Sequence, residues 1–127
     1  MSSTSRIGIE LEDGMVESIY CHWDGYPDNV GKILNQYYQN RGKVKELIAL
    51  GNISSLGIWV RPLPNESHSF ESPAKDTTVA YHRDRNELLS KPYYNKSIEE
   101  FNIELDTQYG YVLGLDGKWK TFTEGLK

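Results

Sequence analysis

The chain has 127 residues, with 14 Lys or Arg against 18 Asp or Glu, so its formal net charge is −4. This length suits one domain with a single modest core, and we expect residues 1–127 to form it. The acidic balance excludes a general DNA binder, which needs a basic face to release counterions from phosphates.

Cysteine content and hydropathy indicate the compartment. Cys21 is the one cysteine of the sequence, which excludes an internal disulfide and suits a reducing cytosol. The N-terminus lacks a basic segment followed by an apolar run, and no stretch of about eighteen apolar residues occurs anywhere. We therefore expect a cytoplasmic protein with no membrane partner.

The first elements read as a β-hairpin. Residues 6–11 alternate apolar and polar side chains, Asp13-Gly14 supplies a turn, and residues 15–22 form a second strand. Successive strand residues point to opposite faces, so Cys21 and His22 should point apart. Both faces of this strand mix apolar and polar residues, so the pattern leaves open which face packs on helices.

Two helices should follow. Asp28 or Asn29 is a credible N-cap for the first, whose apolar residues recur at helical spacing: Val30, Ile33, Leu34, Tyr37 and Tyr38. The second spans residues 43–50 and ends at Gly51. A bend at residues 40–42 joins them into an αα-hairpin.

A long irregular loop is predicted at about residues 54–76, where periodicity is lost and three prolines occur. Such a length is unusual in a compact domain and is typical of a functional loop, an oligomerisation arm or disorder. Trp59, flanked by Ile58 and Val60, has apolar area to bury. We expect it to do so against a second subunit, which predicts a homo-oligomer.

The C-terminal half should complete the sheet. Residues 77–81 predict a strand followed by a charged turn at residues 82–85. Ser97 and Glu100 match a capping box for a helix at residues 97–103, and residues 108–113 and 118–122 flank a turn signal. The expected class is α+β: an antiparallel sheet of about five strands, with an N-terminal hairpin, the αα-hairpin on one face and a C-terminal hairpin.

The most distinctive motif is Ile-Tyr-Cys-His-Trp-Asp-Gly-Tyr-Pro at residues 19–27. Gly25 can adopt a positive φ and Pro27 fixes its own φ, so the turn would present its side chains in a defined direction, as a binding loop does. The candidate ligand-binding residues here are His22, Trp23, Asp24 and Tyr26. In the alternative interpretation the two aromatic residues close one end of the core, while the His and Asp bond locally.

This motif also carries a resemblance. Together with Gly-Lys-Ile-Leu at residues 31–34, residues 47–57, residues 79–85 and the Tyr-rich C-terminal hairpin, it resembles a family of small uncharacterised phage and prophage proteins. The similarity runs over most of the chain. It implies a phage origin, and hence the host cell cytoplasm, but no particular chemistry.

Catalytic and metal-binding patterns are missing from the sequence. There is no Gly-x-Ser-x-Gly elbow and no Walker or Rossmann glycine pattern. His22, His68 and His82 lie in separate segments without metal-ligand spacing. We therefore assign no catalytic residue, no metal ligand and no cofactor.

Arg83 and Arg85 are the strongest lead for a ligand. At i and i+2 after a strand they would lie on one side and offer two donor forks to phosphate or carboxylate oxygens. Tyr81, Trp23, Tyr26 and Trp59 would stack on a base. Replacing either arginine should then weaken binding and leave the melting temperature unchanged. The alternative is a solvated turn in which Asp84 neutralises one arginine.

These observations predict a small binding protein that sequesters, without catalysis, a nucleotide-derived bacterial immune signal of the cyclic oligonucleotide or cyclic ADP-ribose type. The alternative is a protein–protein module that inhibits or redirects a host factor, which the acidic balance, Trp59 and the proline-bearing loop suit equally. A third possibility is a small enzyme that uses His22 with Asp24 or His82, although spacing places neither pair in contact.

Overall fold

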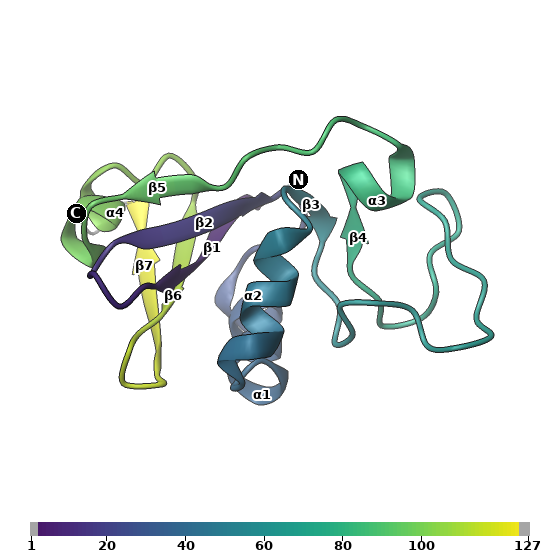
Figure 1. Ribbon diagram of the computed structural model, residues 1–127, viewed down its shortest axis with the longest axis horizontal. Coiled ribbons are helices and arrows are strands. Elements are labelled where there is room, and N and C mark those ends of the chain that lie inside the picture. The colour runs from purple at the N-terminus through teal and green to yellow at the C-terminus, as the bar shows by residue number, and fades with distance from the viewer. Residues whose placement is uncertain (1–2, 125–127) are drawn as a thin grey trace.

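A mixed seven-stranded sheet organises residues 3–124, the part of the chain that the computed structural model describes. The strand order is β4-β3-β2-β1-β6-β7 (Figure 1). β3 and β5 both pair with the same edge of β2, β3 at its C-terminal end and β5 at its N-terminal end. The strands are β1 Ser5–Glu10, β2 Val16–Cys21, β3 Ile53–Ser55, β4 Val79–Ala80, β5 Tyr93–Asn95, β6 Tyr109–Leu113 and β7 Trp119–Thr123.

The sheet corrects one expectation and confirms two. The predicted hairpins are present, because β1 pairs antiparallel with β2, and β6 with β7. However, β1 runs parallel to β6, and β2 runs parallel to β3. An antiparallel sheet of about five strands was therefore wrong. Parallel neighbours require a long crossover between them, and the αα-hairpin supplies it between β2 and β3.

The helices that cover one face of the sheet differ in their boundaries from the prediction. Helical backbone begins with a π-helical turn at Pro27–Gly31, continues into α1 Lys32–Tyr37, and is followed by α2 Arg41–Ala49. Neither Asp28 nor Asn29 is the N-cap, because Pro27 already fits the first helical position and Tyr26 precedes it. Asn40 caps α2 by accepting from the backbone N–H of Lys43.

Both faces of the sheet bury apolar side chains, which explains why the hydrophobic pattern of β2 is ambiguous. Ile7, Ile19 and Cys21 pack with residues of α1 and α2 in one cluster. The opposite face carries a smaller cluster around Val16, which is covered by α4 Ile98–Ile103 and contains Phe101, Leu105 and Val112. Ser97 caps α4 through the N–H of Glu100, as the capping box predicts.

The region between β3 and β4 forms the right-hand part of Figure 1. Residues 56–78 run as irregular backbone, held by an isolated bridge between Trp59 and Thr77. Residues 82–85, expected as a turn, belong to the short helix α3 Tyr81–Arg85, which ends at Asn86 in the left-handed conformation. Across residues 3–124, no helix has the length and apolar character needed to cross a membrane.

Candidate functional site

Two neighbouring clefts lie where the first helices face the irregular segment. The larger, of about 610 Å³, is lined on its helical side by Asp28, Asn29, Lys32, Ile33, Gln36 and Tyr37. Its opposite wall comes from residues 55–58, 73, 74, 76, 77 and 79. The smaller, of about 430 Å³, is lined by Lys43, Glu46, Trp59, Val60, Arg61, Pro62 and Pro64. Both volumes lie within the range of ligand pockets.

Lys43 and Trp59 line the smaller cleft, and Lys43 is bonded to Tyr37, which lines the larger one. The Lys43 ammonium donates to the backbone oxygen of Tyr37 at 2.7 Å, and it lies 4.2 Å from the ring centre of Tyr38 and 5.9 Å from that of Trp59. Its partial burial lowers the pKa of Lys43. Trp59 and Tyr37 keep 42% and 45% of their surface exposed. We call the face made by Tyr37, Lys43, Trp59, Arg61 and Pro62 the Trp59 surface.

Charge along these clefts is balanced. Lys32, Lys43 and Arg61 face the same clefts as Asp28, Glu46 and Asp76, which gives three cations against three carboxylates. Arg61 Nε already lies 2.7 Å from Glu46 Oε1. A phosphate-rich ligand needs an excess of positive charge. The larger cleft has one cation against two carboxylates, and the smaller has two cations against one carboxylate that already pairs with Arg61, so neither offers a large excess.

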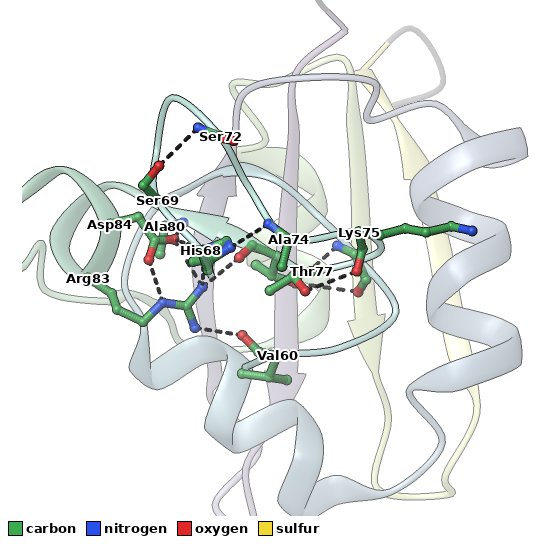
Figure 2. Close-up of polar contacts among 12 residues, drawn as sticks. Val60, His68, Ser69, Ser72, Ala74, Lys75, Thr77, Ala80, Arg83 and Asp84 are labelled. Atoms are coloured by element: carbon green, nitrogen blue, oxygen red, sulfur yellow. Dashed lines mark hydrogen bonds and ion pairs between the residues drawn. The ribbon is translucent and has the colours of Figure 1, made fainter. Parts of the chain in front are cut away.

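Ala74, in one wall of the larger cleft, is bonded to a polar cluster that joins His68 of the irregular segment to Arg83 and Asp84 of α3 (Figure 2). Asp84 Oδ2 accepts from the N–H of Ala80 at 2.8 Å and lies 3.0 Å from His68 Nε2. His68 Nδ1 accepts from the N–H of Ala74, at 2.9 Å, and Ala74 lines the cleft. The side chains of His68 and Asp84 are only 6% and 4% exposed. We call His68, Arg83 and Asp84 the α3 hub.

The electrostatics of the α3 hub favour an ionised Asp84. Burial alone would raise the pKa of this carboxyl, but hydrogen bonds from Arg83, from the Ala80 N–H and from His68 outweigh it and lower the pKa to about 2. The buried charge is therefore fully partnered.

His68 has no free nitrogen for catalysis in this arrangement. Nδ1 accepts from a backbone N–H, so the ring proton of the neutral imidazole is on Nε2, where it is donated to Asp84. A general base needs an unoccupied nitrogen within reach of a substrate proton. The ring instead joins the irregular segment to α3.

The side chains of Arg83 and Arg85 point in different directions. The expectation that both lie on one side of the chain is therefore not met. The i, i+2 spacing puts them on opposite sides of a helix instead of one side of a strand end. Arg83 Nε donates to Asp84 at 2.8 Å, Nη1 to the Val60 oxygen at 2.6 Å and Nη2 to the Thr78 oxygen at 2.5 Å. Each nitrogen of Arg83 is thus engaged within the chain.

Arg85 remains at the surface beside two aromatic rings. Its guanidinium carbon lies 4.5 Å from the ring centre of Phe70 and 4.9 Å from that of Tyr81, and it pairs with Glu87. The pKa of Tyr20 is raised, mainly by burial and secondly by the nearby Tyr81. Of the predicted ligand-binding residues, Tyr81 and Arg85 are therefore in contact.

The predicted binding loop lies at the end of β2. His22 Nδ1 is 2.9 Å from the Tyr20 hydroxyl and its ring packs edge-on against Trp23, with ring centres 4.6 Å apart. Trp23 and Tyr26 are 45% and 39% exposed. Asp24, with its backbone oxygen bonded to the Asn29 amide, has the positive φ of 53°.

The role of Gly25 differs from the predicted one. It is Asp24 that adopts the left-handed backbone, whereas a Cβ on Gly25 would lie only 2.7 Å from the Ser3 oxygen and from Ser5 Cβ. Gly25 is therefore needed for close backbone approach. Its carbonyl also accepts from the buried Tyr111 hydroxyl at 2.7 Å.

The thiol and the other two imidazoles have different bonding partners. Cys21 is buried and points away from His22, as predicted, and burial raises its pKa to about 12. His82 contacts the Glu87 oxygen, far in sequence from the Tyr20 contact of His22. Within residues 3–124, no group of three or more His, Cys, Asp or Glu side chains could hold a metal ion.

Sequence reasoning identified Trp59 but not its neighbours. Lys43, Glu46 and Tyr37 reach the clefts only because the αα-hairpin packs beside the irregular segment. His68 was considered only as a metal candidate, and its pairing with Asp84 spans sixteen positions that no local pattern connects.

Comparisons with known proteins add no relative. No protein-family model, no curated protein and no solved structure matches this chain.

Proposed function

We propose that the chain is a small binding protein that docks another protein on the Trp59 surface. The observation that carries this proposal is the half-exposed Trp59, which lines the smaller cleft beside Lys43, whose ammonium is bonded to Tyr37 of the larger cleft. Trp, Tyr and Arg side chains that become buried at the centre of an interface are the residues that contribute most to protein–protein affinity.

Charge balance supports a protein over a phosphate-rich ligand. Equal numbers of cations and carboxylates around an apolar centre match the polar rim of a protein interface. The phage origin expected from the sequence motif would make the partner a host factor, which this chain would inhibit or redirect.

The α3 hub favours docking without a large conformational change. Arg83 holds the Val60 and Thr78 oxygens, and His68 holds Ala74, so both clefts have walls fixed before a partner arrives. A preorganised surface loses less conformational entropy on binding.

The test uses Trp59→Ala with Leu88→Ala as its matched control, because Leu88 is 96% exposed but lies on the segment between α3 and β5. A host protein that the wild-type chain retains is expressed and purified by itself. Its binding to the wild type and to each variant is then measured by calorimetry. Trp59→Ala should weaken this binding by about tenfold or more, and Leu88→Ala should leave it unchanged. If both variants bind like the wild type, or no purified protein binds, the proposal fails.

A nucleotide-derived immune signal is the second candidate. The exposed Arg85 guanidinium beside the rings of Phe70 and Tyr81 favours it, since bases stack on such groups. Calorimetry with cyclic di- and trinucleotides and ADP-ribose derivatives tests it. Binding that Arg85→Ala weakens and Trp59→Ala spares would support this candidate over the first, and absence of binding would exclude it.

A further inference from the structure

Within residues 3–124, no strand pairs with the outer edge of β7. β7 ends the sheet order and pairs with β6, with Val112 opposite Lys120 and Gly110 opposite Phe122. The Glu124 N–H donates to the Gln108 oxygen and the Gly114 N–H to the Lys118 oxygen, so even-numbered residues face β6. By alternation, the N–H and C=O groups of the odd-numbered residues point outward: Trp119, Thr121 and Thr123.

The strand is also held in a conformation suited to pairing along this open edge. Phe122 packs with the cluster on the α4 side of the sheet, and Trp119 packs with the core on the α1 and α2 side. The Trp119 indole also donates to the Tyr38 oxygen at 2.9 Å. β7 is thus held in extended form by side chains on both faces, as a template for a further strand.

We propose that β7 is a docking edge for a second copy of this chain, which pairs antiparallel about Thr121. In that register Trp119, Thr121 and Thr123 face Thr123, Thr121 and Trp119 of the second copy and exchange hydrogen bonds through their outward groups. Lys118 and Glu124, the residues that directly precede and follow β7, then come to the same ends of the paired strands in the two copies, and the symmetry repeats this pair. Both side chains are exposed in the single chain.

Charge selects this register over its neighbour. A register centred on Lys120 would place two lysines opposite each other, which is destabilising. Centred on Thr121, Lys120 lies opposite Phe122 of the second copy, and its ammonium stays 3.2 Å from Asp116 of its own chain. Lysines on an edge strand usually discourage indiscriminate pairing; here Lys120 disfavours the register that is centred on itself. The sheets of the two copies would become continuous.

Sedimentation equilibrium of the full chain tests the proposal with a charge swap. The wild type should dimerise reversibly. Lys118→Glu and Glu124→Lys, each placing like charges opposite each other, should weaken dimerisation by about tenfold. The double variant should restore it. A wild type that stays monomeric at millimolar concentration, or a double variant no better than the single ones, overturns the proposal.

A second pair of variants separates edge pairing from misfolding. Thr121→Pro removes an outward N–H, which an edge strand tolerates, and should abolish the dimer; Thr121→Val should keep it. Amide spectra that change only at and around β7 would show that both variants fold. If Trp59→Ala abolishes the dimer while Thr121→Pro preserves it, the copies meet on the Trp59 surface instead, and the β7 proposal is wrong.

Discussion

His68 Nε2 lies 3.0 Å from Asp84 Oδ2, and Nδ1 of the same ring accepts a hydrogen bond from the Ala74 N–H at 2.9 Å. One buried imidazole therefore connects α3 to the wall of the larger cleft. The donor and acceptor roles of the two nitrogens are fixed by their partners, and each role can be removed separately.

Three substitutions of His68 should separate these roles. His68→Asn keeps an acceptor near the Nδ1 position, His68→Gln keeps a donor near Nε2, and His68→Ala removes both. His68→Ala should destabilise the fold most, by about 2–3 kcal/mol, because two buried polar groups lose a partner. Urea unfolding would measure the order of the three variants.

Hydrogen exchange at the Ala74 amide provides the specific control. His68→Asn should preserve its protection, whereas His68→Gln and His68→Ala should reduce it. Equal protection in all three variants would contradict the role assigned to Nδ1.

Acid should weaken the fold through Asp84. Its pKa of about 2 in the folded chain lies below the ordinary value of 3.8. A lowered carboxyl pKa stabilises the fold fully above the unfolded value and loses that contribution as the pH falls through the folded value. The loss should amount to about 2 kcal/mol between pH 4 and pH 2, measured by urea unfolding.

Asp84→Asn isolates this contribution from those of other carboxyls. The variant should be less stable at neutral pH and should lack the Asp84 part of the acid dependence. A wild type and a variant whose stabilities fall in parallel below pH 4 would show that Asp84 titrates normally.

Local patterns predicted the fold where neighbouring residues decide it. Asp13-Gly14 and residues 115–117 mark hairpins that the structure contains, and Ser97 with Glu100 marks α4. The parallel pairing of β1 with β6 joins segments about a hundred positions apart, and no local signal encodes such a neighbour.

The candidate site was harder to predict for the same reason. Trp59 was conspicuous by composition, but the Lys43 ammonium reaches it only after α2 packs beside the loop. Arg83 was expected at the surface because its neighbours are charged. In the structure, the carbonyls of Val60 and Thr78 lie within its reach, and these come from segments without a recognisable pattern.

Cys21 should be unreactive in the folded chain. The side chain is buried, its pKa is raised to about 12 by that burial, and Sγ lies 3.6 Å from the Trp23 oxygen. The thiolate is the reactive form, so an aromatic disulfide reagent should label the native protein only as fast as it unfolds. Labelling should be complete in denaturant. Rapid labelling under native conditions would show that the β2 end opens locally.

Arg83→Ala and Arg85→Ala should have opposite consequences. Arg83→Ala leaves Asp84 buried with fewer donors and frees two backbone oxygens, so it should lower the unfolding free energy by about 2–3 kcal/mol. Arg85 is 47% exposed, and its pair with Glu87 should contribute less than about 0.5 kcal/mol. Thermal and urea unfolding of both variants would measure the difference.

Arg83→Lys tests whether geometry or charge matters at this position. A lysine keeps the positive charge beside Asp84 but offers a single ammonium, which cannot reach the Asp84, Val60 and Thr78 oxygens together in the planar arrangement of a guanidinium. Its stability should therefore lie between those of Arg83→Ala and the wild type. If Arg83→Ala instead melts like the wild type, then Arg83 is free of the α3 hub, and its side chain is available to a ligand.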